Sequence, residues 1–221
     1  MKIPAMTYGS RQRILCGQAR GKRVLHLGCV GDRPLKSEEA NLHELLAEEA
    51  MELWGVDLNQ KGLEELAKRL PALRGRLLTG DACKLGDVIG LPHEFDVIIA
   101  GDIIEHLTNP AALFDSCRPL LTSGGVVLIS TPNALGLLNV LRSWRGNEQV
   151  NPAHTCWFSF ATLQELTRRV GWHIDKFFTC YDHESHPYWR RMAATRFFNW
   201  FPQWGGTLVA VVRPVERGMD P

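Results

Sequence analysis

The chain has 221 residues and a formal net charge of +1, with 45% hydrophobic and 22% charged residues. This size and composition are usual for one globular domain, and the balanced charge excludes the strongly basic surface of a general nucleic-acid-binding protein. We therefore expect one domain over residues 1–221, with an N-terminal helical segment at 1–20 and a cytoplasmic location.

Neither targeting nor cross-linking signals stand out in the chain. No run reaches the roughly 20 apolar residues that span a bilayer, and residues 1–10 have no apolar run or cleavage-site pattern. The six cysteines are scattered without a CxxC pair, which favours reduced thiols over disulfides or a zinc site. We expect no transmembrane segment, no signal peptide and no bound metal.

Short apolar runs alternate with helical patterns along the first two thirds of the chain. The runs are apolar on both faces, as in a parallel sheet, and occupy residues 22–28, 53–57, 76–80, 95–101 and 126–131. Helices are predicted at 40–51, 60–70, 109–121 and 159–171, with Asn109 and Ser159 as N-caps. This order predicts an α/β doubly wound sheet with helices on both faces.

The last third of the chain has a different rhythm. Strands are predicted at 172–181 and 206–213, and the absence of a helical crossover between them suggests an antiparallel edge pair. An aromatic insertion at 182–205 separates them, and residues 187–204 hold seven aromatic residues in eighteen. Such a surface fits packing on the sheet edge, a homodimer interface, or a platform for a ligand.

Polar residues and glycines follow the first four predicted strands. In open α/β sheets, ligands bind at the carboxyl ends of the strands. Gly28 lets the backbone approach a ligand closely after the first strand. Asp57 can accept hydrogen bonds from ribose hydroxyls, Asp81 can accept from an adenine amino group, and Asp102 follows the fourth strand.

Residues 22–133 resemble the class I S-adenosylmethionine (SAM)-dependent methyltransferases, particularly the small-molecule type related to ubiquinone-biosynthesis methyltransferases. The most specific stretches are FDVIIAGDIIEHLTNP (95–110) and GGVVLISTPN (124–133), and residues 154–172 are similar to the segment after the sheet. The resemblance implies a Rossmann-like, mostly parallel sheet of seven strands with the last strand antiparallel. It also implies SAM as cofactor.

The residues that the resemblance assigns to the cofactor follow the strands in order: His26, Gly28, Cys29, Val30, Gly31, Asp57, Leu58, Asp81, Ala82, Gly101 and Asp102. The loop around Gly28 is expected along the methionine part of SAM. Asp57 is expected at the ribose, Leu58 and Ala82 on the adenine faces, and Asp81 at its amino group. Gly101 and Asp102 are expected near the methionine amine and the methyl group.

Three positions depart from the family pattern. His26 stands where an acidic residue is usual, and Val30 and Asp32 stand where glycines are usual. A nicotinamide-dependent oxidoreductase is the nearest rival, but it requires a G-x-G-x-x-G turn that opens directly into a helix. A non-catalytic SAM-binding module is the other alternative.

The predicted function is methyl transfer, at oxygen, to a small-molecule or glycan acceptor such as a cell-envelope precursor used at the membrane face. A hydroxyl acceptor is helped by a general base, and the candidates are His154 and His106. Each histidine also has a purely structural interpretation, as a cap or a loop anchor. Nucleic acid is not expected as a partner, because there is no basic stripe.

Overall fold

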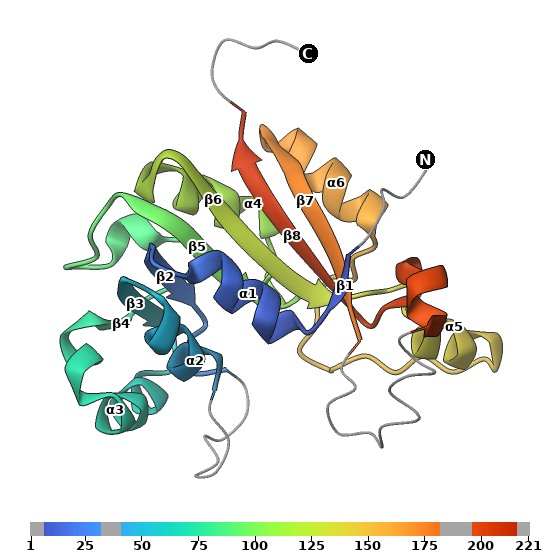
Figure 1. The fold of residues 1–221 in the computed structure, drawn as a ribbon, viewed down its shortest axis with the longest axis horizontal. Coiled ribbons are helices and arrows are strands. Elements are labelled where there is room, and N and C mark those ends of the chain that lie inside the picture. The colour runs from blue at the N-terminus through green and yellow to red at the C-terminus, as the bar shows by residue number, and fades with distance from the viewer. Residues whose placement is uncertain (1–6, 32–40, 182–195, 216–221) are drawn as a thin grey trace.

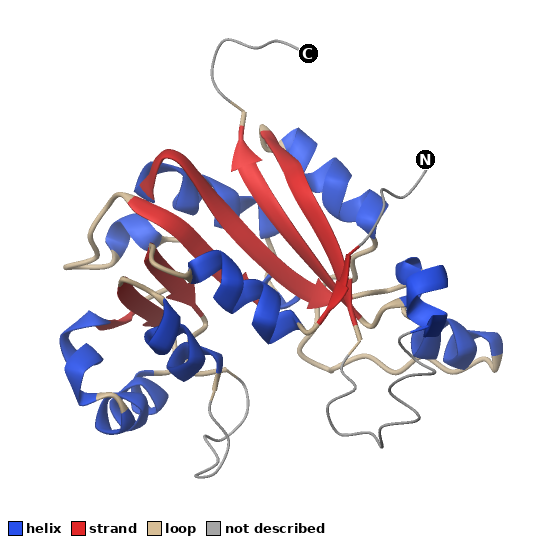
Figure 2. Ribbon diagram, in the orientation of Figure 1, coloured by secondary structure: helices blue, strands red, loops and turns tan. Residues whose placement is uncertain are grey.

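A computed structural model describes residues 7–31, 41–181 and 196–215, which form one sheet with helices on both sides (Figures 1 and 2). The sheet has eight strands in the order β1-β7-β8-β6-β5-β2-β3-β4. The strands are β1 (Thr7–Gly9), β2 (Arg23–Leu27), β3 (Glu52–Asp57), β4 (Leu77–Thr79), β5 (Phe95–Gly101), β6 (Leu121–Pro132), β7 (Trp172–Cys180) and β8 (Thr207–Pro214).

The mostly parallel Rossmann-like sheet with an antiparallel last strand is confirmed, and one further strand joins it. Strands β2 to β6 pair with one another in parallel, whereas β8 is antiparallel to both β6 and β7. β7 and β8 therefore form the antiparallel pair that the sequence suggested, with β8 between β6 and β7. The short strand β1 pairs with β7 and adds an eighth strand to the seven expected.

Helices cover both faces of the sheet (Figure 2). They are α1 (Arg11–Ala19), α2 (Leu42–Glu49), α3 (Gln60–Arg69), α4 (Pro110–Cys117), α5 (Leu137–Trp144) and α6 (Phe160–Arg169). Leu15 of α1 and Leu46 of α2 belong to the core on one face, and Phe114 of α4 and Leu163 of α6 belong to the core on the other. The sheet is therefore enclosed by α1 and α2 on one side and by α4 and α6 on the other.

The apolar run of β5 explains how one strand serves two cores. Val97 and Ile99 pack with the α1–α2 face, and Ile98 and Ala100 pack with the α4–α6 face. All four side chains are fully buried, as the alternation of a strand between two covered faces requires. Burying an aliphatic side chain of this size contributes about 1.5 to 3 kcal/mol.

Side-chain caps set several helix boundaries. Asn41 and Glu44 form a capping box, so α2 begins at Leu42 and not at the predicted residue 40, which lies outside the described residues. Ser159 and Thr162 form a second capping box at α6, which confirms the predicted cap. Asn109 occupies the N-cap position of α4 but makes no side-chain cap bond.

The segments after β6 and β7 differ most from the sequence expectation. Residues 137–144 carried no predicted element but form α5, which lies beside the helical residues 196–204 at one end of the sheet (Figure 1). Residues 182–195 of the predicted aromatic insertion lie outside the described part of the chain. Among the described helices, none is both long and apolar enough to cross a bilayer.

Candidate functional site

The carboxyl ends of β2, β3, β4 and β5 meet at one edge of the sheet because these strands are parallel neighbours. Backbone hydrogen bonds tie their ends together. Gly28 N donates to Val56 O at 2.8 Å, and Gly80 N donates to Asp57 O at 3.0 Å. The residues predicted from the strand ends therefore lie along one continuous edge.

The loop after β2 turns sharply at two glycines. Gly28 and Gly31 have φ values of +65° and +75°, a conformation that favours glycine. A Cβ at Gly28 would lie 2.8 Å from Cδ1 of Ile103, which belongs to the loop after β5. Gly28 thus allows the two loops at this edge to approach each other.

Asp57 at the end of β3 organises the loops beside it. Its Oδ2 accepts from Val30 N at 2.9 Å and its Oδ1 accepts from Asn59 N at 2.8 Å. Each carboxylate oxygen keeps a further lone pair for a ligand. The neighbouring side chain of Leu58 is 73% exposed, so a large apolar surface is available next to this carboxylate.

The loop after β4 presents Asp81 and Ala82. Asp81 Oδ1 accepts from Cys83 N at 2.8 Å, which closes a tight turn. The Ser116 hydroxyl of α4 donates to Ala82 O at 2.5 Å. The turn is therefore held from two sides, and the side chains of Asp81 and Ala82 are partly exposed at the edge.

Asp102 lies directly after β5 with a φ of +53°. Its carboxylate accepts from Ser130 Oγ at 3.0 Å and from Arg11 Nη1 at 2.5 Å. Nη2 of Arg11 lies so near Gly101 that a Cβ there would be 3.1 Å from it. Arg11 was not among the residues predicted from the sequence, because α1 precedes the alternating pattern and no local motif distinguishes this arginine from its neighbours.

Three predicted side chains lie beneath the edge. His26 stacks on His43 of α2 with their Nδ1 atoms 3.2 Å apart, and burial lowers the pKa of both imidazoles, that of His43 to about 4. Cys29 is buried, which raises the pKa of its thiol. Val30 is buried against α3, where a Cβ on Gly62 would collide with it. The side chains of His26, Cys29 and Val30 are therefore largely shielded from the surface.

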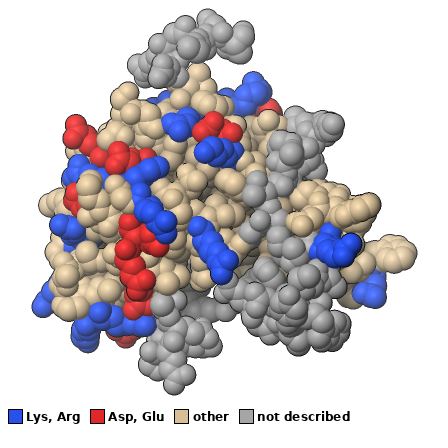
Figure 3. Space-filling view, in the orientation of Figure 1, with Lys and Arg blue, Asp and Glu red and all other residues tan. Residues whose placement is uncertain are grey.

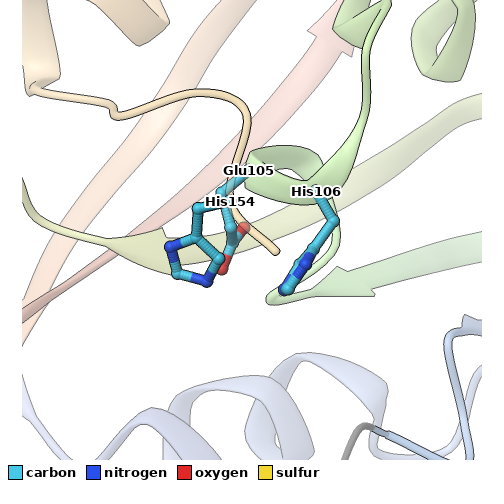
Figure 4. A group of neighbouring side chains, drawn as sticks. All are labelled: Glu105, His106 and His154. Carbon is cyan, nitrogen blue, oxygen red and sulfur yellow. The ribbon is translucent and has the colours of Figure 1, made fainter. Parts of the chain in front are cut away.

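The two candidate bases come together with a third group. The rings of His106 and His154 meet edge to face, with centroids 4.6 Å apart. Glu105 lies beside them, and burial raises the pKa of its carboxyl to about 7. Ligand atoms of the three side chains lie within 4.8 Å of one another (Figure 4). Glu105 and His106 belong to the 3-10 helix Ile104–His106, which follows Asp102 closely in the chain, so this cluster adjoins the carboxyl end of β5.

The chain matches a family model described as "Methyltransferase domain" over residues 10–176. A "Ubiquinone biosynthesis O-methyltransferase" of Vibrio cholerae is 34% identical over 115 residues, which are 51% of this chain and 43% of that protein. A "Probable S-adenosylmethionine-dependent methyltransferase" of Mycolicibacterium smegmatis is 28% identical over 73% of this chain and 56% of its own length. The chain thus spans about half the length of these relatives.

Solved structures agree on the fold. A SAM-dependent methyltransferase from Archaeoglobus fulgidus superposes with a TM-score of 0.59 at 19% identity, covering 91% of this chain and 90% of its own. Magnesium protoporphyrin IX methyltransferase from Synechocystis, solved with bound S-adenosylhomocysteine (SAH), gives 0.56 at 15% identity, covering 90% and 77%. The family match, the strand order and the edge built around Gly28, Asp57 and Asp102 agree. The chain belongs to the class I SAM-dependent methyltransferases, whose cofactor is SAM.

Proposed function

We propose that this protein transfers the methyl group of SAM to an oxygen of a small amphipathic acceptor. The observation that carries the proposal is the juxtaposition at one sheet edge. Asp57 and Asp81 follow the neighbouring strands β3 and β4, Asp102 follows β5 on the other side of β2, and the paired rings of His106 and His154 lie beside the segment after β5. The first group suits a nucleoside with an amino-acid tail, and the second suits a hydroxyl acceptor.

The residues present fit SAM. Asp57 would accept from the ribose hydroxyls, Asp81 from the adenine amino group, and Leu58 and Ala82 would flank the adenine ring. The exposed Leu58 has the apolar surface that such stacking needs. The loop around Gly28 would run along the methionine part.

Arg11 and Asp102 form an ion pair suited to the charged end of the methionine. The methionine group carries an ammonium and a carboxylate, for which Asp102 and Arg11 are the complementary charges. Nε of Arg11 is buried and has no hydrogen-bond partner among the described residues. A buried donor without a partner costs about 1 to 3 kcal/mol, so a carboxylate bound there would relieve that cost.

When bound, SAM supplies a methyl group made electrophilic by the sulfonium. The chain's own contribution is to orient the acceptor hydroxyl. Holding the reactants together in the correct geometry can lower the activation free energy by about 7 kcal/mol or more. His106 and His154 are the groups placed to orient that hydroxyl or to take its proton. The two segments of the chain that carry these histidines are joined, because Thr155 N donates to Glu105 O at 2.8 Å.

We further propose that the acceptor has an apolar chain. Helix α5 exposes 60% of Leu138 and 86% of Trp144, and Trp200 of the nearby helical segment is 81% exposed. Arg142 and Arg145 are the charged residues of α5 and its C-cap, and Figure 3 shows Lys or Arg side chains beside uncharged ones at that end of the molecule. Apolar side chains beside arginines suit a lipid chain and an anionic headgroup or membrane surface.

Two acceptor types share this chemistry: a lipid-linked saccharide of the cell envelope, as the sequence suggested, and a prenylated aromatic, as the name of the Vibrio relative suggests. A panel of both, each with a soluble analogue that lacks the chain, separates them. The proposal requires methyl transfer to the chain-bearing compounds with a lower KM than to the soluble analogues. Equal KM values would contradict it.

Calorimetry with SAH, SAM and NAD tests the cofactor assignment. Tighter binding of NAD than of SAH would restore the oxidoreductase alternative. SAH binding without turnover of any acceptor hydroxyl would favour the non-catalytic module.

We also propose a cytoplasmic location. The competing role of the exposed Trp144 and Trp200 is packing on a second copy of the chain. Light scattering of the purified protein distinguishes a dimer from a monomer.

A further inference from the structure

Glu105, His106 and His154 form a compact group of potential metal ligands. One carboxylate oxygen and one ring nitrogen from each imidazole all lie within 4.8 Å of one another. Figure 4 shows the three side chains converging from two separate segments, the 3-10 helix Ile104–His106 and the loop that precedes α6. The two segments are far apart in the chain.

A set of hydrogen bonds holds these segments together. Thr155 N and Cys156 N both donate to Glu105 O, at 2.8 and 3.1 Å. The Thr155 hydroxyl donates to Leu107 O at 2.7 Å. The residue that follows His154 is thus fixed to the residues on either side of His106. The cluster is therefore built by the fold and does not depend on chance contacts of long side chains.

The buried carboxylate is the second observation. Glu105 has no exposed surface, and neither of its side-chain oxygens has a hydrogen-bond partner in the described part of the chain. A buried carboxylate is costly unless it is paired with a cation or coordinates a metal. The groups near it include Thr131, Asp102 and Arg11 and the two imidazoles, and imidazoles are ligands for divalent transition metals.

We propose that Glu105, His106 and His154 bind one divalent transition-metal ion. Two imidazoles and one carboxylate on one side of an ion are a ligand set used for Zn²⁺ and Fe²⁺, and they leave coordination positions open. Bonds of about 2.0 to 2.2 Å require small inward rotations of the side chains. Both imidazoles are only partly buried and can make them.

The open positions identify what the ion would do. They adjoin the edge where Asp102 lies, so a hydroxyl oxygen of the acceptor can occupy them; this step rests on the proposed function. An acceptor with two neighbouring hydroxyl groups, as on a sugar ring or a catechol, would then be favoured because it can fill two positions. The sequence predicted no metal, because 48 residues separate His106 from His154 and no short metal-binding motif spans them.

Metal binding is measured first, apart from activity. Protein treated with a chelator is titrated with Zn²⁺ and with Co²⁺ by calorimetry and by the visible spectrum of Co²⁺. One ion per chain is expected. Glu105→Gln, His106→Ala and His154→Ala should each weaken binding more than about 100-fold, beyond the loss typical of an outer-shell change. His173→Ala, an exposed histidine on β7, is the matched control and should bind as the wild type does.

Two readouts keep the outcomes separate. SAH affinity should be unchanged in the three variants, so a variant that loses metal binding and still binds SAH supports the ion site. A wild-type protein that binds the metal ion but not SAH would refute the cofactor assignment and leave the ion site standing. If a variant does not fold, Mn²⁺ added to the wild type should broaden the imidazole NMR signals of His106 and His154 and spare that of His173. A wild-type protein that binds no ion, or equal broadening of all three signals, overturns the proposal.

Discussion

Replacing Asp57 by alanine removes the carboxylate that we propose at the ribose of SAM. Its oxygens accept from Val30 N and Asn59 N, and they would also accept from the ribose of SAM. Loss of a charged hydrogen-bond acceptor typically costs about 1 to 3 kcal/mol. At about 1.4 kcal/mol per tenfold change, the affinity for SAH should fall by about 5- to 150-fold.

The same substitution should have a smaller effect on the folded state. The two backbone amides lose their partner, but they lie at a partly exposed edge where water can replace the carboxylate. A net loss of about 1 to 2 kcal/mol follows, which lowers the melting temperature of a domain of this size by roughly 2 to 8 °C. Calorimetry with SAH and thermal denaturation by circular dichroism measure the two effects.

Two further variants sharpen this test. Asp57→Asn keeps one acceptor oxygen and removes the charge, so its affinity for SAH should lie between those of the wild type and the alanine variant. Asp115→Ala changes an exposed aspartate of α4 and should leave the affinity for SAH and the melting temperature unchanged. A folded Asp57→Ala protein that binds SAH within about twofold of the wild type would refute the assignment of this edge to the nucleoside.

Four other substitutions test other parts of the molecule. The buried His43 stays neutral in the folded state, with a pKa lowered to about 4, whereas the unfolded chain binds a proton near pH 6.5. The free energy of unfolding should therefore fall by about 3 kcal/mol as the pH drops from 6.5 to 4, and by clearly less in His43→Gln; equal slopes in urea titrations would count against a buried neutral imidazole. Gly62→Ala places a Cβ in collision with Cγ1 of Val30 and should cost about 1 to 3 kcal/mol of stability by overpacking, which thermal denaturation measures. Trp200→Ala should raise the KM for the acceptor and leave SAH affinity and melting temperature unchanged, because this side chain is 81% exposed. Phe201→Ala removes a ring whose centroid lies 5.0 Å from that of Trp204, so it should raise the KM and also lower the melting temperature. An unchanged KM in both variants would show that the segment is structural.

The central sheet and its cofactor edge were accessible from the sequence because their signals are local. The run 95–101 is apolar on both faces, which is typical of a buried parallel strand, and the structure places β5 at the same residues. Asp57 and Asp81 could be placed together because parallel neighbouring strands present their carboxyl ends at one edge. Ser159 was recognised as a cap because serine is favoured at the N-cap position, and the structure adds Thr162 as the other half of a capping box.

Contacts between distant segments had no such signal. Arg11 meets Asp102 only because α1 packs across the sheet, and 91 residues separate them. Position in the sheet follows the same rule: β8 lies between β6 and β7 because its hydrogen bonds pair with both, which its own apolar pattern does not reveal.

The sequence by itself determined which segments become buried strands and which residues stand at their ends, since period, caps and glycine turns act over a few residues. It determined neither the burial of His26 against His43 nor the cluster of Glu105, His106 and His154. His26 meets His43 because α2 packs on β2, and His154 meets Glu105 and His106 because Thr155 and Cys156 bond to Glu105 O across about fifty positions of the chain. Tertiary packing alone decides which distant side chains share a site.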